Sequence, residues 1–61
     1  MKVEELNIVQ KAEIIRSMAI EIREDKNDLS MYKAYLMANT ELNNLDEIDD
    51  KKYKKEINLE F

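Results

Sequence analysis

The fold of this chain is decided by residues 8–45, IVQKAEIIRSMAIEIREDKNDLSMYKAYLMANTELNNL. This stretch contains two sets of apolar residues with alternating spacings of four and three, which place side chains along one side of an α-helix. The first set is Ile8, Ala12, Ile15, Ala19 and Ile22, and the second is Met31, Tyr35, Ala38, Leu42 and Leu45. Residues 23–28, between the two sets, are all polar. We therefore expect an antiparallel helical hairpin in which the two sets form a seam, with Ile22 facing Met31 and Ile8 facing Leu45.

The composition and the order of charges indicate where the helices begin and end. Because the chain has no Gly and no Pro, it lacks strong helix breakers, and a single all-α unit over residues 1–61 is expected. We predict a first helix over about residues 3–24 and a second over about 29–43, capped by Asn27 or Asp28. Asn44 and Glu47 have the spacing of a capping box, and acidic residues precede basic ones. A short third helix is therefore expected over about residues 46–56, followed by a tail over 57–61.

A single long helix is the alternative to the hairpin. One set of apolar residues is also spaced by seven, as in a coiled coil: Ile8, Ile15, Ile22, Leu29 and Leu36. A coiled coil needs a second apolar position in each seven-residue repeat. Here that position is lysine twice, at Lys26 and Lys33, which weakens the pattern. The hairpin is therefore the favoured architecture.

The residue types exclude several classes of function. The chain has no Cys and no His, so disulfides and the usual zinc and haem sites are excluded, and no metal or cofactor is expected. It has no Gly for a phosphate-binding loop, and its only serines, Ser17 and Ser30, lie in no nucleophile motif. We therefore expect a protein that is not an enzyme. No apolar run is long enough for a signal sequence or a membrane span, so a cytoplasmic location without membrane contact is expected.

The seam does not use all the large apolar residues of the two helices. Those outside it, which an isolated hairpin would leave largely exposed, are Ile14, Met18, Ile20, Tyr32, Leu36 and Met37. A chain of this size buries only about 60% of its unfolded surface, so one seam gives too little apolar burial to offset the lost conformational entropy. We expect a second copy to cover part of this surface, which gives a homodimeric four-helix bundle, or another protein to dock on it.

Protein–protein contact is therefore the function that the sequence favours. Met18, Tyr32, Leu36 and Met37 are the candidate contact residues, because such side chains commonly anchor interfaces. The net charge of −4 disfavours non-specific binding to nucleic acid. The prediction is a small regulatory or inhibitory protein that acts by binding another protein.

A dimeric nucleic-acid-binding regulator is the alternative function. It would use the only basic patch, which consists of Lys51, Lys52, Tyr53, Lys54 and Lys55. A basic run with an aromatic residue can hold a phosphate backbone and stack on a base. However, Asp46, Glu47, Asp49 and Asp50 precede the patch and balance its charge. Nucleic-acid binding is therefore the less favoured function, and the spacing of the acids gives little support to a third possibility, mimicry of nucleic acid.

Overall fold

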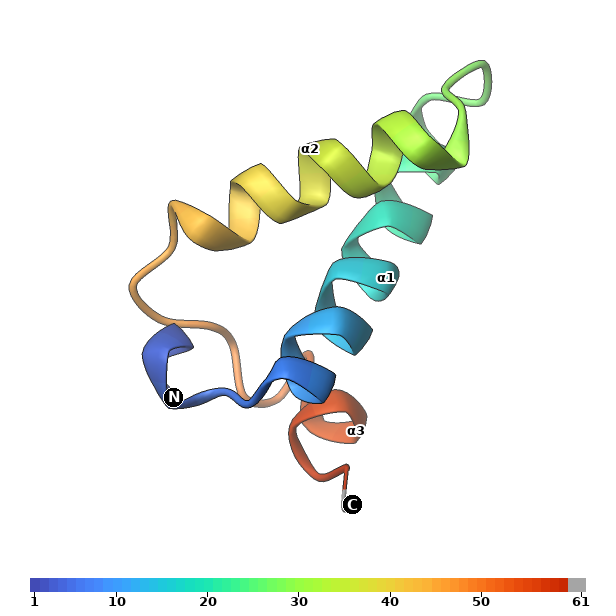
Figure 1. Ribbon diagram of the computed structural model, residues 1–61. Helices are drawn as coiled ribbons and strands as arrows, with labels where there is room; N and C mark the ends of the chain where they lie inside the picture. The colour runs from blue at the N-terminus through green and yellow to red at the C-terminus, as the bar shows by residue number, and fades with distance from the viewer. Residues whose placement is uncertain (60–61) are drawn as a thin grey trace.

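The computed structural model describes residues 1–59 and confirms a mostly helical chain with two long helices packed against each other. A short 3-10 helix, η1 (Val3–Glu5), precedes α1 (Ile8–Asp25), α2 (Met31–Asn43) and a single-turn α3 (Lys54–Ile57). Figure 1 shows α1 and α2 meeting at the turn that joins them and diverging towards their other ends. The single long helix is therefore wrong, because the chain reverses between Asp25 and Met31.

The first helix begins five residues later than predicted. Asn7 caps α1, because its Oδ1 accepts the Gln10 backbone N–H at 2.8 Å, while Gln10 Oε1 accepts the Asn7 N–H at 2.8 Å. This reciprocal pair is a capping box. The extended backbone at Leu6 separates η1 from α1 and lets the Leu6 side chain enter the core, where it is buried.

The second helix begins at Met31, because its N-cap is Ser30. The predicted caps, Asn27 and Asp28, are therefore wrong. Ser30 Oγ accepts the Lys33 backbone N–H at 3.2 Å. The turn before it is held by Arg23, whose Nε donates to the Leu29 carbonyl at 3.1 Å. The helix ends at Asn43, close to the predicted residue, and Asn44 is its C-cap with right-handed helical backbone.

A short third helix is present as predicted, but it spans only Lys54–Ile57 and not residues 46–56. Residues 46–48 run beside the N-terminus instead: the Val3 N–H donates to the Asp46 carbonyl and the Ile48 N–H donates to the Met1 carbonyl, both at 3.0 Å. Both Ile48 and Tyr53 are buried. Residues five apart point about 140° away from each other on an α-helix, so an irregular chain is needed to direct both inward. Of the predicted tail, Ile57 belongs to α3, while Glu60 and Phe61 lie outside the described residues.

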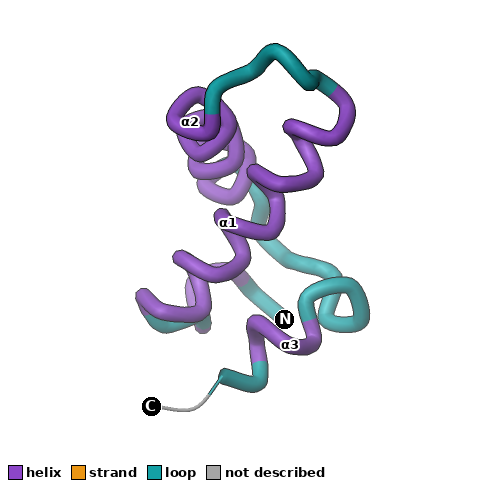
Figure 2. Tube along the Cα trace, turned by 90° about the vertical axis from the view of Figure 1, so that its right-hand side faces the viewer, coloured by secondary structure: helices purple, strands orange, loops and turns teal. Residues whose placement is uncertain are grey.

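The C-terminal segment covers the side of α1 that contains Ile14 and Met18, which were expected to be exposed. Figures 1 and 2 both show α3 beside the first half of α1. Gln10 Nε2 donates to the Ile57 carbonyl at 2.6 Å, and Ser17 Oγ donates to Glu56 Oε2 at 3.1 Å. An ion pair of 3.0 Å joins Lys52 Nζ to Glu21 Oε2. The buried core therefore combines α1, α2, the residue between η1 and α1, and the segment before α3: Leu6, Ile14, Met18, Ala19, Ala34, Ala38, Leu42, Ile48 and Tyr53.

The predicted seam holds over most of its length and fails at Ile8 and Ala12 on α1 and at Leu45 after α2. Ala19, Ala38 and Leu42 are buried. The seam residues that are partly buried and packed against the core are Ile15, Ile22, Met31 and Tyr35. In contrast, Ile8 is 82% exposed, Leu45 is 39% exposed, and Ala12 is also exposed. The expected contact of Ile8 with Leu45 is wrong, because the two helices diverge and the α1 side of the core is turned towards Ile14 and Met18.

No helix within residues 1–59 is long and apolar enough to cross a membrane.

Candidate functional site

Helix α2 carries large apolar side chains on the side that faces away from α1. Its residues Ala34, Ala38 and Leu42 are buried against the core. On the other side, Tyr32 is 73% exposed, Leu36 is 50% exposed and Met37 is 39% exposed. Single exposed apolar residues are common on protein surfaces, but three on one short helix make this side of α2 a candidate contact surface. We call Tyr32, Leu36 and Met37 the α2 outer surface.

A shallow hollow lies within this surface. It has a volume of about 400 Å³ and is lined by Leu36, Met37, Thr40 and Glu41. The hydroxyl of Thr40 donates to the Leu36 carbonyl at 3.0 Å, so this donor is already satisfied within the helix. The surface thus combines an apolar centre with charged residues at its edge, Lys33 and Glu41, which is the usual anatomy of a protein–protein contact.

Met18 does not belong to this surface, so its expected exposure is wrong. Its side chain is 5% exposed, and that of Ile14 is fully buried. Both belong to the core cluster that also contains Ile48 and Tyr53. Met18 is therefore a core residue, whereas Tyr32, Leu36 and Met37 remain available for contact. Ile20, which is 41% exposed, lies apart from them beside the turn, where it lines a hollow with Met31.

The basic patch is divided by the fold. Tyr53 is 6% exposed, and this burial raises the pKa of its phenol above the usual value. Lys52 lies 5.5 Å from the centre of the Tyr53 ring, and its pKa is raised first by its hydrogen bond to Glu21. Lys51, Lys54 and Lys55 are exposed, and none of the three makes an ion pair within the described part of the chain. Because Tyr53 is buried, the patch has no aromatic ring that can stack on a base.

The acidic residues before the patch stabilise local structure. Asp49 Oδ1 accepts the backbone N–H groups of Lys51 and Lys52 at 3.0 and 3.3 Å. Asp50 Oδ1 accepts a hydrogen bond of 2.7 Å from the α-amino group of Met1, and this bond is the first cause of the raised pKa of that group. Over residues 1–59, no three acidic side chains lie close enough together to hold a metal ion.

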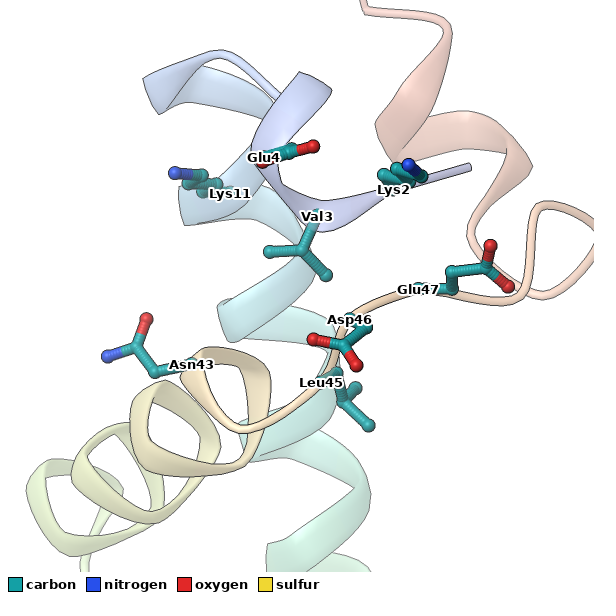
Figure 3. Close-up of a pocket in the computed structure, with 8 residues that line it drawn as sticks. All are labelled: Lys2, Val3, Glu4, Lys11, Asn43, Leu45, Asp46 and Glu47. Atoms are coloured by element: carbon teal, nitrogen blue, oxygen red, sulfur yellow. The ribbon is translucent and has the colours of Figure 1, made fainter.

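The largest hollow lies at the open end of the hairpin. It has a volume of about 760 Å³ and is lined by Lys2, Val3, Glu4, Lys11, Asn43, Leu45, Asp46 and Glu47 (Figure 3). These residues come from the N-terminal segment, the first half of α1, the end of α2 and the chain that follows it. Ligand pockets are mostly apolar with a few convergent polar groups. This hollow instead has scattered charges of both signs, so it is a weaker candidate than the α2 outer surface.

Both serines take part in structural hydrogen bonds. Ser17 joins α1 to α3 through Glu56, and Ser30 caps α2. Both hydroxyls are thus engaged in contacts within the fold. No protein-family model, curated protein or solved structure matches this chain.

Proposed function

We propose that this chain is a small regulatory or inhibitory protein that acts through protein–protein contact at the α2 outer surface. The observation that carries the proposal is the distribution of side chains on α2. This helix buries Ala34, Ala38 and Leu42, of which only Leu42 is large, but exposes Tyr32, Leu36 and Met37. Full burial of one such large side chain contributes about 1.5–3 kcal/mol. A partner that covers all three therefore gains several kcal/mol from a small area.

The types of residue support contact with a protein in particular. Tyrosine is enriched among the residues that dominate binding energy, and methionine adapts its shape to irregular partner surfaces. Tyr32 and Leu36 are four residues apart, so they are neighbours on the helix surface. Met37 lies on the other side of Leu36 and lines the same hollow, so the three residues form an apolar arc on one helix, which fits a contact with a helix or a groove of another protein.

The expected homodimeric four-helix bundle is part of this proposal in a narrower form. The sequence predicts a dimer because large apolar residues of both helices lie outside the seam. The C-terminal segment covers Ile14 and Met18, and the large apolar side chains that stay exposed on α1 are separated, with Ile8 and Val9 in its first turn and Ile20 near its end, whereas those on α2 lie within six residues. A second copy would therefore meet the first through α2, and the surface that it covers is the same surface that another protein would use.

The proposal is tested by affinity capture with mass spectrometry, using the wild-type chain and the variants Leu36→Glu and Ile8→Glu. Leu36 lies in the α2 outer surface, whereas Ile8 is equally apolar, more exposed and located at the start of α1. Both variants should keep the fold, because surface substitutions usually change stability by about 0.5 kcal/mol or less. We expect wild type and Ile8→Glu to capture the same partner, and Leu36→Glu to lose it. Capture of the partner by all three, or no partner besides the chain itself, would contradict the proposal.

A further inference from the structure

We propose that a second copy of this chain binds the α2 outer surface, with the two α2 helices antiparallel and their two-fold axis at Met37. This inference rests on the proposed function, because it names the protein that covers the surface when no other target is present. It is carried by the order of charges along α2 and by the exposure of the residues between them.

The charges on α2 are complementary to themselves in one orientation. Lys33 lies four residues before Met37 and Glu41 lies four residues after it, and both are exposed. Neither forms an ion pair with any residue in the described range 1–59. In an antiparallel pair, a residue before the axis on one copy meets a residue after the axis on the other. Lys33 of each copy therefore lies near Glu41 of the other, and this ion pair forms twice.

A parallel arrangement has the opposite consequence. It would place Lys33 beside Lys33 and Glu41 beside Glu41, and like charges brought together in an interface are unfavourable. The charge order therefore selects the antiparallel orientation and excludes the parallel one by repulsion. This selection is a property of two residues that the fold leaves at the surface.

The residues at the axis are suited to being buried. In this register Met37 of one copy meets Met37 of the other, and the two Leu36 side chains lie one residue from the axis, so four large apolar side chains meet at the centre. Thr40 brings no unsatisfied donor into the contact, because its hydroxyl already donates to the Leu36 carbonyl. Tyr32 lies one turn from the centre and would extend the apolar contact at both edges. Figure 1 shows α2 at the edge of the molecule, so a second helix can approach it.

The size of the contact predicts a weak, reversible dimer. Helix α2 has 13 residues and is therefore about 20 Å long. Pairing through one helix of this length buries less than the about 800 Å² per partner of a standard interface. The dimer should therefore form with a dissociation constant of about micromolar or weaker, and it should dissociate on dilution.

Sedimentation equilibrium of the full chain tests the inference, with charge-reversal variants at concentrations from about 10 to 500 μM. The variants are K33E, E41K, the double variant K33E/E41K, and an equimolar mixture of the two single variants. K26E and E24K serve as matched controls, because Lys26 and Glu24 are exposed residues outside α2. Circular dichroism confirms that each variant keeps its helices.

We expect the wild type and both controls to dimerise, and K33E and E41K to lose at least about tenfold in affinity through like-charge contacts. The double variant and the mixture should dimerise again, because each restores two pairs of opposite charges. A wild type that stays monomeric throughout would overturn self-pairing, while leaving the Leu36→Glu capture experiment to judge contact with other proteins. Dimerisation of K33E and E41K at the level of the controls, or no recovery in the double variant and the mixture, would overturn this register.

Discussion

Gln10 Nε2 donates a hydrogen bond of 2.6 Å to the carbonyl of Ile57, and this bond joins the first turn of α1 to the end of α3 across 47 residues. The same side chain accepts the Asn7 backbone N–H through its Oε1. One amide group thus caps α1 with its oxygen and anchors the C-terminal segment with its nitrogen. The replacement Gln10→Glu separates these two functions, because a carboxylate keeps an acceptor for the cap and loses the donor.

Gln10→Glu should loosen α3 while it preserves the start of α1. A partly buried carbonyl left without its donor costs about 1–2 kcal/mol, and a glutamate in the first helical turn recovers a part of this through the helix dipole. We expect faster hydrogen exchange at the amides of Ile57 and Asn58, measured by NMR, and unchanged exchange within α1. Asn7→Asp is the control, because it keeps the cap but makes no contact with Ile57. Equal protection of α3 in wild type and Gln10→Glu would show that the Gln10 amide does not anchor it.

Two tyrosines should respond very differently to truncation. Tyr53 is 6% exposed and packs in the core, whereas Tyr32 is 73% exposed on α2. We expect Tyr53→Ala to lower the free energy of unfolding by about 3–5 kcal/mol, as is usual for large buried aromatic residues. Tyr32→Ala should change it by about 0.5 kcal/mol or less. Urea denaturation followed by circular dichroism measures both, and similar losses for the two variants would contradict the placement of the C-terminal segment.

Burial of Tyr53 also predicts a loss of stability in alkaline solution. Its pKa is raised in the folded state, first because burial disfavours the charged phenolate. Below about pH 10 the phenol is protonated in both the folded and the unfolded chain, and its contribution to stability is complete. Above that pH the unfolded chain releases the proton first, so the folded state loses stability as the pH rises through the raised pKa.

The variant Tyr53→Phe isolates this effect, because it has no proton to release. Lys52 is unchanged in the variant, so its own titration affects both proteins. We expect the free energy of unfolding to fall more steeply above about pH 10 in wild type than in Tyr53→Phe. Parallel curves for the two proteins would mean that the Tyr53 phenol ionises as freely in the folded chain as in the unfolded one.

The nucleic-acid alternative makes a separate prediction. Lys51, Lys54 and Lys55 are exposed, but Tyr53 is buried and Lys52 is paired with Glu21. With a net charge of −4 and no stacking residue in the patch, retention on heparin or RNA should be weak. We expect elution at low salt, unchanged in the variant Lys54→Glu. Strong retention that falls steeply with salt, and that Lys54→Glu weakens, would instead favour a nucleic-acid-binding regulator.

Much of the hairpin is predictable from the sequence, because the spacing of apolar residues and the polar break act locally. Ala19, Ala38 and Leu42 are buried as the spacing indicates. The start of α1 was also accessible from local signals, since Asn7 and Gln10 have the spacing of a capping box. The predicted helix begins at residue 3 instead, five residues before Ile8, the first residue of the seam.

The C-terminal segment was not predictable from local patterns. The order of charges over residues 46–55 favours a helix. Tertiary contacts instead direct Ile48 and Tyr53 to the core and place residues 46–48 beside the N-terminus. These contacts join residues more than 40 positions apart, which periodicity does not encode. For the same reason Met18 was assigned to the exposed surface, while Tyr32, Leu36 and Met37 were assigned correctly as exposed.

The most direct test of the central claim, that another protein molecule covers the α2 outer surface, is the oxidation rate of Met37 by peroxide. Met18 is an internal reference, because it is 5% exposed whereas Met37 is 39% exposed. Peptide mass spectrometry follows both residues in dilute chain, in concentrated chain and in the captured complex. We predict rapid oxidation of Met37 in dilute solution and its protection in at least one associated form, with Met18 slow throughout. Oxidation of Met37 at the same rate in all three samples would contradict the account.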